Sequence, residues 1–239
     1  MTSDLDIVAI ENIPITALHH NVDLLVNAAD VDGYATTYLI VPGMIYGQPK
    51  GPLFDGPEPI ANALTLAIRK FSELSVHRGR PGIVGKGANV WPYVHVEDSA
   101  FLCSDDAAWL FIREYCSDAD AYFRLFDAAV FNPERVSHGR EGYFFVAGSE
   151  RSGYDVVKAV GEALVELGVI TESEPDVFTA EERLKYFGSE YIATLFFSNA
   201  RCTADRIRQE LGWVPKRSTE DFAKHIREDV EVAIKKLKA

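Results

Sequence analysis

The sequence predicts an α/β fold, because strand-like and helix-like hydrophobic patterns occur in the same chain. Residues 34–42 and 142–148 are short segments rich in β-branched and aromatic side chains, which is typical of core strands. Residues 58–76 and 152–168 carry apolar side chains at the spacing of one helix face. We therefore expect buried strands covered by amphipathic helices.

The remaining elements follow in chain order from their end signals. Residues 20–33 are expected to form a short helix that ends at a glycine. The helix over 58–76 is expected to bury one face, made of Ile60, Leu64, Ala67, Ile68, Phe71 and Leu74. Residues 79–96 are interpreted as two short strands around a turn, and 97–99 as the cap of a following helix. Residues 118–138 are expected to be helical or irregular.

The C-terminal part predicts helices with clear caps. Ser152 is placed to cap the helix that ends near Gly168. Thr179 is followed three residues later by Glu182, which is the capping-box pattern. Further helices are expected at about 203–211 and 219–237.

Composition excludes several classes of protein. The 239 residues carry a net charge of −12, which argues against non-specific binding to nucleic acid or to an anionic membrane. There is no apolar segment long enough to span a membrane and no signal-peptide pattern. Cys103, Cys116 and Cys202 are far apart and form no C-x-x-C motif, so we expect a reducing cytoplasm, no disulfide and no metal site.

Two motifs typical of dehydrogenases fail in their context. The glycines of GRPGIVG (79–85) have the spacing of a dinucleotide loop, but such a loop must follow a strand and open a helix. This segment follows a predicted helix and leads into a strand-like one, so a turn is the favoured interpretation. Tyr154 and Lys158 form a Y-x-x-x-K pair inside an amphipathic helix, where a packed or solvated helix face is favoured over a catalytic pair.

Three other segments resemble one enzyme family. VPGMIYGQPKGP, GKGANVWPYVHVEDSA and ELGWVPK resemble, in order and spacing, segments of the extended short-chain dehydrogenases. Together with the opening TSDLDIVAI, they are similar to the fungal branch of NAD-dependent epimerase/dehydratase-like proteins. The resemblance implies a Rossmann-like fold with a C-terminal substrate cap. It implies one α/β domain over 1–239, in which 1–57 supply a residual core strand and loop and 58–239 the substrate-binding cap part with a returning core strand.

The chain also departs from the family pattern. The resemblance begins in the middle of that pattern, after the glycine-rich loop, the ribose-binding acid and the catalytic serine, so we expect an N-terminally truncated relative without a redox cofactor. The initiator Met favours a natural short protein over a shortened version. Ile15 and His19 stand where the family has its catalytic tyrosine and lysine. Trp91 and Pro92 stand at its Arg-Asp pair, so an anion-binding residue is replaced by an aromatic one.

These losses lead to our first hypothesis, a cofactor-independent enzyme. It would isomerise or cyclise a small hydrophobic, natural-product-like substrate, including by a pericyclic [4+2] step, through orientation and polarisation. The candidate donors are Tyr46, Trp91, Tyr93, His95 and His19. Each has a structural alternative: anchoring a loop, filling the core or starting a helix.

Two further hypotheses stay open. The chain could be part of an NAD(P)-dependent oxidoreductase or epimerase that a partner completes, or it could be a non-catalytic binding module. In all three cases a sheet without its first strands would expose an apolar face and an edge, so we expect a homo-oligomer or a rebuilt packing.

Overall fold

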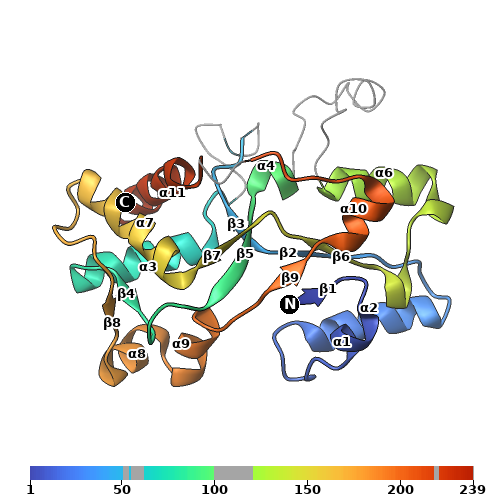
Figure 1. Ribbon diagram of the computed structural model, residues 1–239, viewed down its shortest axis with the longest axis horizontal. Coiled ribbons are helices and arrows are strands. Elements are labelled where there is room, and N and C mark those ends of the chain that lie inside the picture. The colour runs from blue at the N-terminus through green and yellow to red at the C-terminus, as the bar shows by residue number, and fades with distance from the viewer. Residues whose placement is uncertain (51–53, 55–61, 100–120, 218–220, 239) are drawn as a thin grey trace. The chain divides into compact units, whose positions relative to one another are not determined.

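A computed structural model describes residues 1–50, 54, 62–99, 121–217 and 221–238 (Figure 1). The predicted α/β class is confirmed, with helices and mainly parallel strand pairs. The chain divides into two compact units, each built from three separate segments. Unit 1 comprises Met1–Gly43, Glu97–Gly148 and Arg201–Lys216; unit 2 comprises Met44–Val96, Ser149–Ala200 and Arg217–Ala239. The expectation of a single domain over 1–239 stays a prediction.

The strands of unit 1 form two parallel pairs. β2 (Leu39–Pro42) pairs with β6 (Tyr143–Val146), and β1 (Thr2–Ser3) pairs with β9 (Cys202–Thr203). β6 is buried throughout, as the sequence predicts. The prediction of a buried first strand is wrong, because β2 is half-buried to exposed. The side chains of β2 are less buried than those of β6, since among the described residues β2 has one partner strand, β6.

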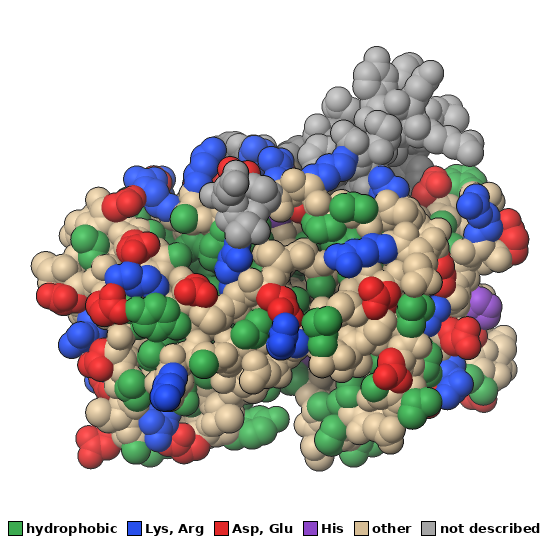
Figure 2. Space-filling model, viewed as in Figure 1, with side chains coloured by type: hydrophobic (Ala, Val, Ile, Leu, Met, Phe, Trp, Pro, Cys, Tyr) green, Lys and Arg blue, Asp and Glu red, His purple; other side chains and the backbone are tan. Residues whose placement is uncertain are grey.

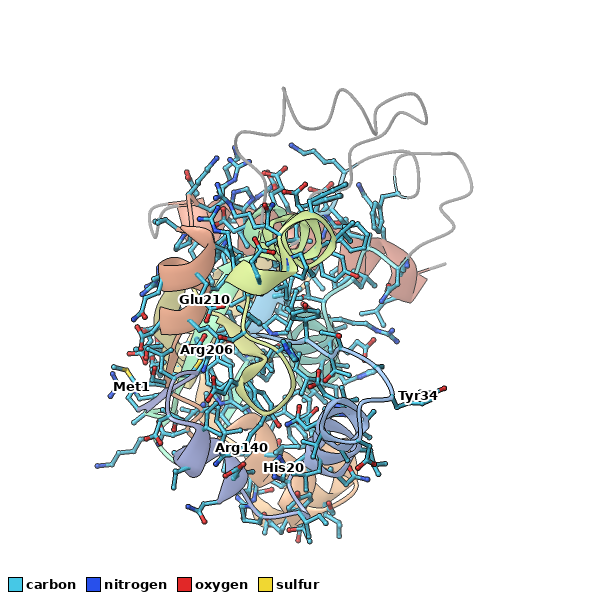
Figure 3. All side chains as sticks on the ribbon, turned by 90° about the vertical axis from the view of Figure 1, so that its right-hand side faces the viewer. Met1, His20, Tyr34, Arg140, Arg206 and Glu210 are labelled. Carbon is cyan, nitrogen blue, oxygen red and sulfur yellow. The ribbon has the colours of Figure 1, made fainter. Side chains whose placement is uncertain are left out.

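The helices of unit 1 surround these strands. They are α1 (Ile7–Glu11), α2 (His20–Val31), α4 (Val96–Ser99), α6 (Ala121–Phe131) and α10 (Asp205–Leu211), with 3₁₀ turns at Pro133–Arg135 and Gly139–Glu141. The buried carboxylate of Asp4 links β6 to α10, because it accepts the backbone N–H groups of Phe145, Asp205 and Arg206 at 2.8–3.0 Å. Figure 3 shows Arg206 close to Glu210 on α10, and their side chains pair at 3.1 Å.

Two of the family-like segments meet in unit 1. The Trp213 indole N–H, from the ELGWVPK segment, donates to the backbone oxygen of Asp98 at 3.0 Å. The Asp98 carboxylate accepts the backbone N–H of Lys216, also at 3.0 Å. Trp213 is only 1% exposed, so its hydrogen bond to Asp98 lies in the interior. Residues 100–120, where a helix was expected to follow, lie outside the described residues.

Unit 2 contains a three-stranded sheet. β5 (Val90–His95) lies between parallel β3 (Met44–Tyr46) and antiparallel β7 (Ser149–Ser152). β4 (Gly82–Ile83) pairs instead with β8 (Asp176–Val177). The predicted short strands are present, but the expected turn does not close a hairpin between them. β4 is drawn to β8 because Gly82 lies against the ring of Phe178, which follows β8.

Three helices of unit 2 pack on one another, and Figure 1 shows them together: α3 (Leu66–Arg78), α7 (Gly153–Glu166) and α11 (Phe222–Lys238). They bury apolar side chains that include Ile68, Phe71, Val156, Val160, Leu164, Ile226 and Val230. Two short helices complete the unit, α8 (Ala180–Phe187) and α9 (Glu190–Phe196). No helix among the described residues is long and apolar enough to cross a membrane.

Most helix ends agree with their sequence signals. Ser152 caps α7, and Thr179 and Glu182 form the predicted capping box of α8. The first long helix of unit 2 begins at Leu66, not at residue 58. The Asn62 side chain explains the late start, because it bonds both the backbone N–H and the backbone oxygen of Leu64 at 3.1 Å and holds that segment in a turn.

Candidate functional site

Two neighbouring strands of unit 2 bring Tyr46 and His95 together. In the parallel pair of β3 and β5, Tyr46 stands opposite His95, and each is the last residue of its strand. Their rings meet edge to face with centroids 5.2 Å apart, and each residue is 2% exposed. The carboxyl ends of adjacent parallel strands are where α/β sheets place their ligands. This edge is therefore the candidate site.

Helix α11 supplies the other side of the cluster. The ring of His225 lies 4.3 Å from that of His95, centroid to centroid. Phe222 packs against Tyr46 at 4.9 Å and against Tyr93 at 5.7 Å. The site thus combines two imidazoles with three aromatic rings.

Asp229 ties the turn after β3 to the same helix. Its Oδ2 accepts the Gly47 backbone N–H at 2.8 Å, and its Oδ1 accepts the Gln48 side-chain amide. The residue is 1% exposed. Burial raises the pKa of the Asp229 carboxyl to about 6, against the opposing effect of its two hydrogen bonds and of His225.

Gly47 allows this close approach. Its φ of +90° lies in the region that favours glycine. A Cβ at this position would lie 2.2 Å from Nε2 of His95. Tyr46 and Gly47, from the VPGMIYGQPKGP segment, therefore both pack against His95.

His95 is electrically neutral near pH 7. Burial lowers its pKa to about 3, and the neighbouring His225, Arg217 and Lys50 act in the same direction. Burial also raises the pKa of the Tyr93 phenol well above its usual range. These two groups are therefore held in uncharged form within the site.

His225 is the most accessible imidazole of the cluster, with 15% of its side chain exposed. Its Nδ1 lies 3.2 Å from Oε2 of Glu228. A carboxylate at Nδ1 favours a proton there, which leaves Nε2 as the basic nitrogen. A histidine oriented in this way can take up and return a proton.

The residues singled out from the sequence separate into three groups. Tyr46, Tyr93 and His95 come together as described. Trp91 lies on β5 two residues before Tyr93. It donates its indole N–H to the backbone oxygen of Ser198 at 2.5 Å, so its N–H already has a structural partner. His19 belongs to unit 1, where it is exposed and precedes α2 with a φ of 68°. The catalytic roles of all five stay predictions.

His225 and Asp229 were not singled out from the sequence. A usable signal existed, because Asp229 falls on the buried stripe of α11 that also carries Phe222, Ile226 and Ala233. A carboxylate on an apolar stripe must find donors in the interior. His225, one helical turn earlier, could then have been placed near the same spot.

The first dehydrogenase-like motif serves packing and the second forms a surface hydrogen-bonded ion pair, so these residues do not fit a nicotinamide cofactor. Gly79 ends α3, and Gly82 leaves room for the Phe178 ring, 2.2 Å from where its Cβ would lie. Tyr154 and Lys158 are on α7, as expected, but both side chains bind the exposed carboxylate of Glu174. The amide-lined helix start that a pyrophosphate requires is not formed by 79–85.

Among the described residues, no group of three His, Cys, Asp or Glu side chains could hold a metal ion. No protein-family model and no curated protein sequence matches the chain.

Three solved structures of similar fold are named as epimerases or dehydratases. A UDP-glucuronic acid 4-epimerase from Bacillus cereus, in complex with UDP-glucuronic acid and NAD, superposes with a TM-score of 0.53 at 9% identity, over 93% of this chain and 55% of that one. A dTDP-glucose 4,6-dehydratase from Bacillus anthracis, in complex with NAD, gives 0.50 at 15%, over 94% and 53%. An epimerase from Methanothermobacter thermautotrophicus gives 0.51 at 10%, over 90% and 49%.

These likenesses show a shared Rossmann-like α/β fold of the epimerase/dehydratase kind. The chain spans about half the length of each of these three proteins.

Proposed function

We propose that the chain is an acid–base enzyme that isomerises or cyclises a small, largely apolar substrate without a redox cofactor. The observation that carries this proposal is the cluster of His225, His95 and Tyr46 at the carboxyl ends of β3 and β5. In this proposal His225 exchanges the proton, since it is oriented by Glu228 and reaches the surface.

The neighbours of His225 give the site its character. Neutral His95 lies edge to face with it and adds no competing charge at pH 7. The rings of Tyr46, Tyr93 and Phe222 supply apolar surface, which suits a substrate with a hydrophobic body. Holding such a substrate beside one proton-transfer group can contribute much of the lowering of an isomerisation barrier. A pericyclic ring closure would need the orientation alone.

The test is a search for products of unchanged mass. Purified protein is incubated with apolar polyene, terpenoid-like and enone substrates, and products are resolved by chromatography and mass spectrometry. With a substrate found, His225→Gln is expected to lower kcat by about 100-fold or more. The matched control is His77→Gln, which changes an exposed histidine of the same unit. Equal turnover by His225→Gln and wild type would remove His225 from the mechanism.

A second candidate is an NAD(P)-dependent oxidoreductase or epimerase whose cofactor site requires a partner. The shared fold with NAD complexes supports it, while the packing of 79–85 and of Tyr154 opposes it. Calorimetric titration with NADH and NADPH separates the two. Tight binding would replace our proposal with hydride transfer, and a folded protein that binds neither would remove the redox class. A chain that also turns over no substrate would be a binding module.

We also propose that the chain is a member of the extended short-chain dehydrogenases, in their fungal branch.

We further propose that the chain self-associates. Exposed apolar side chains lie at the start of α2 and just before it, where Leu18, Val22 and Leu25 are 65%, 51% and 70% exposed. Figure 2 shows other hydrophobic side chains exposed among charged ones. Light scattering tests the homo-oligomer, and a monomer at micromolar concentration would refute it.

A further inference from the structure

The turn formed by Gly47 and Gln48 is held between a histidine and a carboxylate. On one side, the Cα of Gly47 lies so close to His95 that a Cβ would overlap the ring. On the other side, each oxygen of Asp229 accepts one donor of the turn, the Gly47 backbone N–H and the Gln48 amide. Sequence positions 47 and 229 are far apart, so these bonds are tertiary contacts within unit 2.

We propose that Asp229 is the positioning residue of the candidate site: its carboxylate holds the Gly47–Gln48 turn against His95, and its protonation releases the turn. The chemistry of the contact leads to this conclusion. An ionised carboxylate accepts at both oxygens, whereas the protonated acid carries an O–H on one of them. Because the Gly47 backbone N–H can only donate, protonation at Oδ2 sets an O–H against it and removes that bond. Protonation at Oδ1 loses the Gln48 bond unless the amide turns to present its oxygen.

The charged groups that act on Asp229 lie on its own helix. On α11, His225 favours the ionised carboxylate and Glu228 opposes it. The turn after β3 contributes two neutral donors. On α3, which packs on α11, Arg69 and Glu73 pair with each other; on α7, Glu166 pairs with Arg227 of α11. His225 is thus the neighbour whose effect on the turn must be separated from that of Asp229.

The expected pH range follows from burial. Because burial raises the pKa of Asp229 to about 6, the carboxylate is mostly ionised at pH 7 and mostly protonated at pH 5. The turn is therefore expected to be held in neutral solution and released in mildly acidic solution. The effect on turnover rests on the proposed function, but the change in the turn does not.

Nuclear magnetic resonance of the 239-residue chain tests the turn directly. The Gly47 amide resonance of the wild type is expected to titrate with a midpoint near pH 6, and its protection against hydrogen exchange to fall at least tenfold on the acidic side. Asp229→Asn is expected to abolish this titration. His225→Gln is expected to keep it.

Two results would overturn the proposal: a Gly47 amide that does not titrate between about pH 5 and 7, or a titration that survives in Asp229→Asn and disappears in His225→Gln. If Asp229→Asn does not fold, the carboxyl ¹³C resonance of Asp229 in the wild type takes its place. That resonance must then titrate together with the Gly47 amide, and a carboxyl midpoint near 4 contradicts the idea.

Activity supplies an independent readout. With a substrate in hand, the acidic limb of the kcat profile is expected near pH 6 in the wild type and displaced in Asp229→Asn. A titrating Gly47 amide in a chain that turns over no substrate would support the control of the turn by Asp229 and argue against the proposed enzyme. A site that works equally well at pH 5 and 7, with a titrating amide, would show that the turn does not control it.

Discussion

Replacing His95 with glutamine is expected to make the folded chain less sensitive to acid. The wild-type imidazole is 2% exposed, and its pKa is lowered to about 3 from an ordinary value of 6.5. Between pH 6.5 and about pH 3, His95 is therefore protonated in the unfolded chain and neutral in the folded chain. The stability contributed by neutral His95 is therefore complete above pH 6.5 and is lost as the pH falls toward 3.

The magnitude follows from the same two values. Between pH 7.5 and 5, the proton taken up only by the unfolded state lowers the free energy of unfolding by about 2 kcal/mol. Asp229 acts in the opposite direction. Its pKa is raised to about 6, so its buried charge disfavours folding at high pH, and acidification over the same range raises the free energy of unfolding by about 1 kcal/mol. In the wild type the two effects partly cancel.

The assay is urea denaturation at pH 7.5 and pH 5 for the wild type, His95→Gln and His77→Gln. The loss on acidification in the wild type, minus the loss in His95→Gln, isolates His95, since Asp229 is common to both. We expect this difference to be about 2 kcal/mol. His77→Gln alters an exposed histidine and is expected to behave like the wild type. Equal acid sensitivity of His95→Gln and wild type would refute a buried, neutral His95.

Two packing predictions test the fold around the site. Gly82→Ala places a Cβ 2.2 Å from the ring of Phe178, so we expect about 1–3 kcal/mol of destabilisation in thermal or urea unfolding, and an unchanged stability would show that β4 does not lie against that ring. Trp213→Phe removes the indole N–H that donates to Asp98 at 3.0 Å in the interior, and is expected to cost about 1–3 kcal/mol; a neutral result would argue against the contact between the two family-like segments.

The sequence by itself determined the local elements of this protein. Caps such as Ser152 and the Thr179–Glu182 box act within one turn of helix, so residues a few positions apart are sufficient to specify them. The strand predicted in the second half of residues 79–96 is likewise present as β5. The apolar periodicity predicted a helix from residue 58, whereas α3 begins at Leu66. The Asn62 side chain holds the segment before Leu66 in a turn by a local hydrogen bond, and a pattern of apolar residues carries no information about such a bond.

Only the tertiary structure decided which strands pair and which residues form the site. β4 pairs with β8 and not with its neighbour β5, because a ring from a distant segment fills the space beside Gly82. His225 and Asp229 meet His95 and Gly47 only after α11 packs beside β3. Local propensity acts over a few residues, whereas burial and hydrogen bonding of a carboxylate depend on partners far along the chain, and these contacts define the site.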